Sequence, residues 1–306
     1  MAEREFIARL AATLGKDPAA RGFQDDAALW MPPIGRNLVF THDVLAAGVH
    51  FLPDDPPSDV AWKLVAVNLS DLAAMAATPA GVLLGLGLSA AEGDAWREAF
   101  IAGLKRALDH FQVPLWGGDT VSGLAQAVLG LTAIGWVEQG KALGRAGAQV
   151  GDGLWVSGTI GDAGLGLAVA KGEAPFDKAL LGRFRRPTPR IALGQALGGL
   201  ATAGMDVSDG LLIDADRLAR ASGVGLAIAL DAVPAVQAPN LDTMLARVTA
   251  GDDYELLVTL PAGTPPPAVK GVALTPIGRV VEGGGLTLSW QGQPVPTPAR
   301  LGWEHG

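Results

Sequence analysis

The acidic residues of this chain recur in short motifs rich in glycine, serine and threonine, at the ends of apolar segments. Small or apolar residues flank most of them, and few have a lysine or arginine close by in the sequence. Because an unpaired carboxylate is costly to bury, a fold that collects such residues needs a compensating cation. The motifs are Asp25-Asp26, THD with Asp43, NLSD with Asp71, GGDT with Asp119, DVSDG with Asp206 and Asp209, and AGDDYE with Asp252 and Asp253.

The ligand atoms of these motifs indicate the kind of cation. Oxygen ligands without cysteine or clustered histidine are typical of a hard ion, Mg2+ before Ca2+. Mg2+ held by scattered carboxylates usually acts together with the phosphate groups of a substrate. The pattern therefore predicts phosphoryl transfer.

Composition excludes several classes of protein. A length of 306 residues is sufficient for two domains. A net charge of −8 argues against nucleic acid as a partner. The absence of cysteine removes disulfides, thiolate metal sites and cysteine nucleophiles, and fits a reducing, cytoplasmic compartment. The N-terminal stretch lacks the layout of a signal peptide. Residues 72–91 carry no charge, but the TPAG segment at 78–81 interrupts them, so we expect a helix end, a turn and a buried strand, with no membrane span.

Hydrophobic periodicity predicts an α/β protein of mixed α+β character with two domains, residues 1–138 and 139–306. The boundary falls at the glycine-rich, polar stretch 139–153. The first half is βαβαβ-like, with a turn at Gly117-Gly118, and the end of the chain is predicted to form loops around short strands. The predicted helices are 3–14, 60–77, 94–111, one opened by the glycine loop at 158–166, 191–203 and 211–221; the predicted strands are 37–44, 81–88, 125–137, 154–157, 225–230 and 255–260.

Several motifs allow both a functional and a structural interpretation. Asp119 in GGDT could hold Mg2+ beside a phosphate or could cap a helix. Asp71 lies in an otherwise apolar helix, which favours a metal ligand over an internally hydrogen-bonded side chain. Asp206 and Asp209 precede a helix, and capping alone would not require Asp206. The glycines from Gly158 to Gly166 miss the dinucleotide fingerprint and favour close helix–strand packing.

For two further side chains and one basic stretch, the default interpretation is not a functional one. A lone histidine beside a strand, such as His50, is more often structural than functional. The basic stretch at 182–190 could meet phosphate, although charge runs are usually solvated. Trp303 could stack on an aromatic ligand, although a packed or surface tryptophan is the default.

Taken in order, the motifs resemble the thiamine-monophosphate kinases, members of the superfamily of aminoimidazole-ribonucleotide synthetase and selenophosphate synthetase. The resemblance spans residues 25 to about 260. The stretches that carry it are DDAAL, THDVLAAGVHF, KLVAVNLSDLAAMAATP, GGDT, ALGRAGAQVGD, DVSDGL and GDDYELLVT.

The resemblance implies ATP-dependent phosphorylation of thiamine monophosphate to thiamine diphosphate with several Mg2+ ions. It also implies an N-terminal α/β domain that forms a homodimer through its sheet, a C-terminal α/β domain, and an active site between the two. No general base or nucleophile is assigned, because an anionic phosphate acceptor scarcely needs one and catalysis can rest on positioning and charge compensation. The implied metal ligands are Asp26, Thr41, His42, Asp43, Asp71, Asp119, Asp206 and Asp209; the implied ATP contacts are Gly118, Asp119, Arg145 and Ser208; the implied substrate contacts are His50, Asp252 and Trp303.

Four positions depart from the family pattern. Gln24 replaces a glycine before the first acidic pair, and His42 stands where threonine is usual. Ser122 occupies the place of an arginine, and Asp252 replaces a glutamate, which shortens the arm of a substrate contact.

Two other functions compete with this one. A sibling ATP-dependent synthetase or kinase is the nearest alternative, although a selenophosphate synthetase is disfavoured because the chain has no cysteine. A non-catalytic protein that binds divalent ions or nucleotides is the alternative from a different class.

Overall fold

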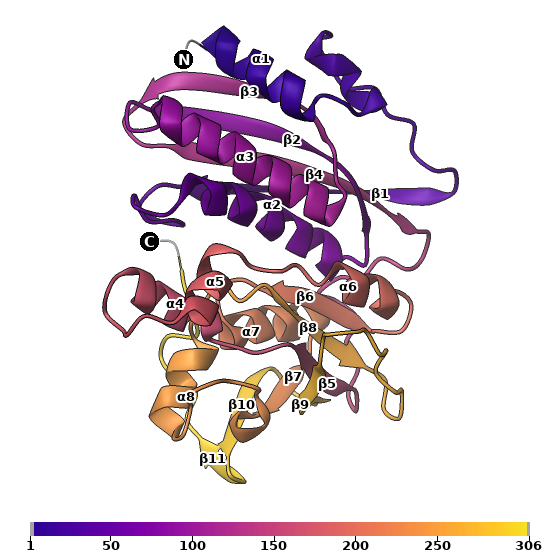
Figure 1. Ribbon diagram of the computed structural model, residues 1–306. Coiled ribbons are helices and arrows are strands. Elements are labelled where there is room, and N and C mark those ends of the chain that lie inside the picture. The colour runs from indigo at the N-terminus through magenta and orange to yellow at the C-terminus, as the bar shows by residue number, and fades with distance from the viewer. Residues whose placement is uncertain (1–2, 305–306) are drawn as a thin grey trace. The chain divides into compact units, whose positions relative to one another are not determined.

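The computed structural model describes residues 3–304, and its contacts divide the chain into two compact units (Figure 1). The first comprises Met1–Leu72 and Thr78–Glu138, and the second comprises Ala73–Ala77 and Gln139–Gly306. The short segment belongs with the second unit because the backbone N–H of Leu143 donates to the carbonyl of Met75 (3.4 Å). Each unit has its own sheet.

The first unit is built on a four-stranded sheet in the order β1-β4-β2-β3. Strands β2 and β3 are parallel and are joined by α3, whereas β4 runs antiparallel to both β1 and β2. Helices α2 and α3 lie against one face of this sheet (Figure 1). The elements are α1 (Glu3–Leu14), η1 (Pro18–Phe23), β1 (Arg36–Ala46), α2 (Pro57–Ala74), β2 (Thr78–Ser89), α3 (Asp94–Phe111), β3 (Leu115–Leu124) and β4 (Val128–Glu138).

Apolar spacing explains this packing. Helix α3 buries Phe100, Leu104 and Leu108, which are one turn apart, and it ends where Gln112 adopts a left-handed conformation. Strand β2 buries alternate residues on the helix side: Val82, Leu84, Leu86 and Leu88. The predicted helix 94–111 and the βαβαβ order are confirmed.

Two predictions near the glycines and the proline of this unit are wrong. Gly117 and Gly118 form no turn but lie inside β3, because a Cβ at Gly118 would stand 2.0 Å from the Leu84 carbonyl oxygen and only glycine allows the strands so close. The break expected at Pro79 falls within β2, which starts at Thr78. Pro79 pairs with Gly135 of β4, but pairing of β2 with β3 starts only at Val82, so the proline has an unpaired side that tolerates its missing N–H group.

The second unit is built on a seven-stranded sheet in the order β11-β10-β7-β9-β5-β8-β6. Helix α7 packs against β6, β7 and β10, and it buries Leu211, Leu212, Ala215 and Leu218 in the core of this unit. The elements are β5 (Gly153–Ser157), α4 (Asp162–Ala170), α5 (Lys178–Arg185), α6 (Ile191–Leu197), β6 (Ala203–Val207), α7 (Leu211–Ser222), β7 (Gly225–Ala229), η2 (Leu230–Ala232), α8 (Leu241–Val248), β8 (Glu255–Leu260), β9 (Leu274–Val281), β10 (Gly285–Trp290) and β11 (Gln293–Val295).

The sequence-based prediction of this unit is partly confirmed. Strand 255–260 is confirmed, and the helix predicted at 211–221 is present with a slightly later end. The helix predicted at 191–203 ends instead at Leu197, since Gly199 has a φ of 80°, and Ala203 already begins β6. Helices α5 and α8 were not expected, and β9 is a central strand rather than part of a loop-rich tail.

Within residues 3–304, no helix has the length and apolar character needed to cross a membrane. The uncharged stretch at 72–91 is divided between the end of α2 and strand β2, as expected, but the division falls at residues 75–77, before the TPAG segment.

We predict that Gly278→Ala lowers the free energy of unfolding by about 1–3 kcal/mol, because overpacking in a central strand forces the backbones apart. A Cβ at Gly278 would lie 2.0 Å from the Ala227 carbonyl oxygen. Gly284→Ala is the matched control, since no heavy atom lies within 4 Å of a Cβ there. Urea unfolding of both variants measures the difference, and equal midpoints would contradict the predicted close approach.

Candidate functional site

In the first unit, strand β1 and helix α2 bring three of the predicted metal ligands together. The Thr41 hydroxyl donates to the Asp71 carboxylate. The backbone N–H of Asp43 donates to Oδ1 of Asn68 (3.0 Å), whose own amide donates to the carbonyl of Leu64 (2.9 Å). Thr41, Asp43 and Asp71 therefore lie on the side of the sheet that α2 covers, held by a buried asparagine.

His42 and Asp119 lie on the other face of the same sheet. Successive residues of a strand point to opposite faces, so His42 points away from Thr41 and Asp43, and its Nδ1 lies 2.9 Å from the Thr132 hydroxyl. Asp119 pairs in register with Gly85 of β2, which pairs with Gly130 of β4, which in turn pairs with Val44 of β1. Paired residues in such a row point to the same face of the sheet, so Asp119, like Val44, points away from α2. The structure thus separates these two side chains from Thr41, Asp43 and Asp71.

The other predicted residues of the first unit have separate surroundings. Asp26 lies in the segment between η1 and β1, and Gly118 is exposed but lies close to the backbone of Leu84 in β2. His50 closes the turn after β1: its Nδ1 accepts from the backbone N–H of Ala46 (3.1 Å), and its carbonyl accepts from Nζ of Lys63 (3.0 Å). These contacts support a structural role for His50.

In the second unit, the carboxylate of Asp214 holds the DVSDG loop between β6 and α7, a role that the sequence analysis did not predict. The backbone N–H groups of Ser208 and Asp209 donate to Oδ2 of Asp214 (3.0 and 3.1 Å). Burial raises the pKa of the Asp214 carboxyl, against the lowering effect of these hydrogen bonds and of Arg217. Arg217 donates to both Asp214 (2.7 Å) and Asp209 (2.5 Å).

Arg217 supplies a positive charge that the motif pattern did not reveal. It lies eight residues beyond Asp209, about two turns along α7, so helical periodicity is the signal that could have found it. Asp209 is therefore already ion-paired within its own unit. Asp206, also a predicted metal ligand, is buried near the end of β6.

Two of the predicted substrate residues converge on the DVSDG loop from distant parts of the chain. The backbone N–H of Asp252 donates to the Ser208 carbonyl (2.7 Å), and that of Trp303 donates to the Asp209 carbonyl (2.8 Å). Gly302 permits this approach, because a Cβ there would lie 2.4 Å from the Asp209 carbonyl oxygen. Asp206, Ser208, Asp209, Asp252 and Trp303 thus form one site, which we call the DVSDG site.

The surroundings of Trp303 and Arg145 differ. The Trp303 ring is 48% exposed, and the Arg300 guanidinium lies 5.5 Å from its centroid. The backbone of Arg145 lies far from Ser208. The Arg145 carbonyl accepts from the Ser222 hydroxyl (2.9 Å) at the end of α7, and that end is about 18 Å along the helix from the DVSDG site.

Oxygen donors suit Mg2+, yet the structure gathers no compact ligand set. Among residues 3–304, no group of three or more histidine, aspartate and glutamate side chains is placed to hold a metal ion. The pair Asp43 and Asp71, with the Thr41 hydroxyl, fits a hard cation by donor type. In the DVSDG site, Arg217 already compensates Asp209.

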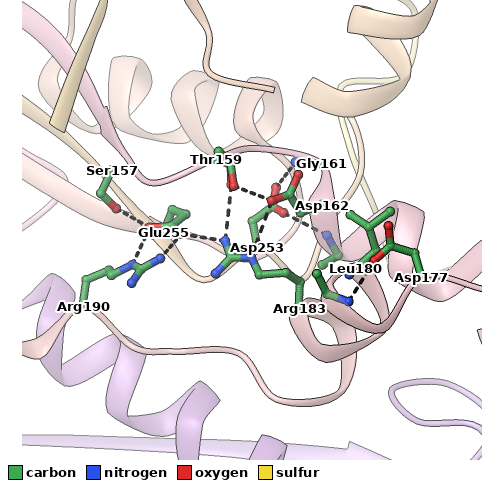
Figure 2. A network of polar contacts seen from close by, with 12 residues as sticks. Ser157, Thr159, Gly161, Asp162, Asp177, Leu180, Arg183, Arg190, Asp253 and Glu255 are labelled. Carbon is green, nitrogen blue, oxygen red and sulfur yellow. Dashed lines mark hydrogen bonds and ion pairs between the residues drawn. The ribbon is translucent and has the colours of Figure 1, made fainter. Parts of the chain in front are cut away.

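Beside the DVSDG site, two buried carboxylates hold a polar network (Figure 2). Asp253 accepts from the backbone N–H groups of Gly161 (2.7 Å) and Ala163 (3.4 Å) at the start of α4. Glu255 accepts from Ser157, Arg183 and Arg190. An internal carboxylate therefore occupies the position at the start of α4 where a phosphate would bind.

The glycine loop before α4 serves close packing, as the sequence favoured. A Cβ at Gly161 would lie 2.6 Å from Arg247, and one at Gly164 would lie 2.6 Å from Ala250. A Cβ at Gly166 would lie 2.1 Å from the Leu180 carbonyl oxygen. Each glycine thus allows a helix or loop to approach α4.

The chain matches known proteins over both units. Residues 24–137 match the N-terminal domain of AIR synthase related proteins, and residues 149–291 match the C-terminal domain. The thiamine-monophosphate kinase of Caulobacter vibrioides is 41% identical over 99% of this chain and 91% of its own length. The chain belongs to the thiamine-monophosphate kinase family.

Solved structures of this family share the fold. The thiamine-monophosphate kinase from Stenotrophomonas maltophilia K279a is 38% identical, with a TM-score of 0.82 over 96% of this chain and 98% of that one. AaThiL, solved as a complex with AMPPCP and TMP, is 32% identical, with a TM-score of 0.79 over 99% of this chain and 97% of that one. The expected family and the mixed α/β fold are confirmed.

The buried carboxyl of Asp253 predicts a pH-dependent stability. Burial raises its pKa well above the ordinary value, although Gly161, Ala163 and Arg183 act in the opposite direction. The unfolded chain loses this proton near pH 4, whereas the folded chain resists losing it, so folding is penalised increasingly as the pH rises above about 4.

We therefore predict that Asp253→Asn, which carries no charge, loses less unfolding free energy than the wild type between pH 5 and pH 8. Urea unfolding across this range measures the difference. Asp109→Asn, which changes an exposed carboxylate paired with Lys105, is the control. Parallel pH profiles for wild type and Asp253→Asn would contradict the prediction.

Proposed function

We propose that this chain transfers the γ-phosphoryl group of ATP to thiamine monophosphate, which yields thiamine diphosphate and ADP. The observation that carries the proposal is the 41% identity to a thiamine-monophosphate kinase over almost the entire chain. The similarity to AaThiL, which was solved with AMPPCP and TMP, supports it. Because ATP is the phosphoryl donor, we expect the enzyme to act in the cytoplasm.

The transfer is a single in-line step. An oxygen of the thiamine phosphate group forms a bond to the γ-phosphorus as the bond from that phosphorus to the ADP oxygen breaks. The attacking oxygen is already anionic at neutral pH, so no side chain has to remove a proton, and no covalent enzyme intermediate is needed. The protein therefore contributes orientation and compensation of negative charge.

The DVSDG site supplies the substrate contacts in this proposal. Asp252 and Trp303 are anchored to the same loop through their backbones, so their side chains can act on one ligand. Trp303 offers an aromatic face to the cationic thiazolium ring or to the pyrimidine, an interaction worth about 0.5–2 kcal/mol. Ser208 in the same loop, with Gly118, Asp119 and Arg145, is assigned to ATP by family resemblance.

Mg2+ is part of the proposal because the chain is acidic and binds two anionic ligands. In the first unit, Asp43 and Asp71 with the Thr41 hydroxyl would hold one ion by donor chemistry, and in the second unit Asp206 is assigned to Mg2+ by resemblance. His50 is assigned a substrate contact only by resemblance. When bound, the ion would offset the charge that accumulates between the two phosphate groups.

A coupled assay of ADP release tests the function. We expect Mg2+-dependent ADP formation with thiamine monophosphate and thiamine diphosphate as the co-product. Aminoimidazole ribonucleotide precursors and other phosphorylated acceptors should give no signal. Turnover with another acceptor alone would indicate a sibling synthetase or kinase, and nucleotide binding without turnover would indicate a non-catalytic protein.

Asp71→Asn tests the proposed metal ligands. We expect kcat/KM to fall about tenfold or more at ordinary Mg2+ concentrations, because a neutral amide is a poorer ligand. Without Mg2+, the unfolding free energy should stay equal or rise, since a negative charge near Asp43 is removed and the amide oxygen can still accept from Thr41. Asp109→Asn is the control, and near-normal turnover of Asp71→Asn would contradict the assignment.

We also propose that the enzyme is a homodimer formed through the sheet face that α2 and α3 leave uncovered. Strand alternation and register place Leu38, Phe40, Val44, Val121 and Val128 on that face, and all of them are exposed in the single chain. Exposed apolar patches of this kind mark interaction surfaces, and a second copy of the same face is self-complementary.

Phe40, which is 62% exposed, tests this surface. We predict that Phe40→Asp shifts the molar mass from that of a dimer to that of a monomer, because the charge would be buried without a partner. Light scattering after size-exclusion chromatography measures the mass. Phe176→Asp, at an exposed position of the other unit, should leave it unchanged. A monomeric wild type would refute the dimer.

A further inference from the structure

We propose that Glu255, Arg183 and Arg190 form a positioning cluster that holds Asp252 in place for thiamine monophosphate. The inference rests on the proposed function and on Asp252 as a substrate contact. None of the three side chains has to touch the substrate: they act through the loop of residues 251–254.

Glu255 is the anchor of the cluster. It begins β8, and its side chain is fully buried. Its carboxylate accepts from Nη2 of Arg183 (2.7 Å), from Nε of Arg190 (2.6 Å) and from the Ser157 hydroxyl (2.6 Å), and Nη2 of Arg190 also donates to it (Figure 2). A buried charge with this many charge-assisted hydrogen bonds has a fixed orientation.

The two arginines reach Glu255 from a segment outside the sheet. Arg183 lies in α5, and Arg190 directly precedes α6, so 65 to 72 residues separate them from their partner. Gly158 leaves room for the carboxylate, since a Cβ there would lie 2.2 Å from Glu255 Oε1. Two arginines of the basic stretch are thereby assigned to an internal carboxylate rather than to a ligand.

The loop that precedes Glu255 has an unfavourable backbone. Asp252 and Tyr254 have φ values of 69° and 51°, in the left-handed region that residues other than glycine rarely adopt. Such a conformation persists only when the surrounding contacts over-determine it. Here Asp253, between the two, is tied to the start of α4, and Glu255 directly after them is tied to both arginines.

This arrangement leaves one side chain of the loop partly exposed. Of residues 252–255, only Asp252 is not buried. Its backbone N–H donates to the Ser208 carbonyl, and Oδ1 of its carboxylate accepts from the Tyr254 hydroxyl (3.1 Å). The anchored residues on its C-terminal side therefore determine where the Asp252 carboxylate stands in the DVSDG site.

Arg190→Lys tests the cluster with the charge retained. Lysine cannot reproduce the two hydrogen bonds of the guanidinium to Glu255, so we expect the loop to loosen and the KM for thiamine monophosphate to rise about five- to thirty-fold. The KM for ATP should change less than twofold. The matched control is Arg220→Lys, which alters an ion pair with Asp216 near the end of α7 and should leave both constants unchanged.

Combination with Asp252→Asn separates positioning from general stability. If Arg190 acts through Asp252, Arg190→Lys should raise the KM for thiamine monophosphate less than twofold further in the Asp252→Asn background. Multiplicative effects, equal rises in both KM values, or a fall in kcat alone would overturn the proposal. Should Arg190→Lys fail to fold, Ser157→Ala, which removes one donor to Glu255, is judged by the same criteria.

The controls distinguish the two levels of inference. A wild type that forms no thiamine diphosphate refutes the proposed function, and the positioning role is refuted with it. An active wild type together with a folded Arg190→Lys variant of unchanged KM refutes the positioning role alone.

Discussion

A carboxylate removed from water must be compensated, and much of the second unit is arranged around this requirement. Glu255 is compensated by Arg183 and Arg190, Asp214 by Arg217 and by two backbone N–H groups, and Asp253 by the first N–H groups of α4. Each compensation joins segments that are far apart in sequence or fixes a loop between regular elements. Removing one partner would leave a buried charge uncompensated and would cost its full desolvation free energy, so these contacts constrain the loops around the DVSDG site.

The DVSDG site itself is assembled mainly through the backbone. Asp252 and Trp303 bond to the carbonyl groups of Ser208 and Asp209, so their positions do not depend on which side chains they carry. This explains how aspartate can stand where the family usually has glutamate without disturbing the loop. The shorter side chain changes the reach of the carboxylate, whereas the hydrogen bond that anchors the residue remains.

Local signals in the sequence were sufficient to predict an element and its bounds where that element is long and its apolar residues repeat regularly. Helix α3 was predicted with its observed bounds because its apolar residues repeat at helical spacing. The prediction of a turn at Gly117-Gly118 was wrong because glycine is typical both of turns and of closely approaching strands. Only the position of the Leu84 carbonyl decides between these two structures. That error also hid the side of the sheet on which Asp119 lies. The pairing of Glu255 with two arginines had no local signal, since contacts over such separations follow from the fold and not from neighbouring residues.

The central position of β9 has a consequence for synthesis of the chain. The four strands of the first unit are all present once residue 138 has been made, so that sheet can close early. In the second unit, β9 lies between β7 and β5, and Val281 is its last residue. While the ribosome is still translating, β5 and β7 must therefore wait with unpaired edges for the strand that will join them. During that interval the nascent chain exposes apolar strands, and chaperones would find their target in this half of the molecule.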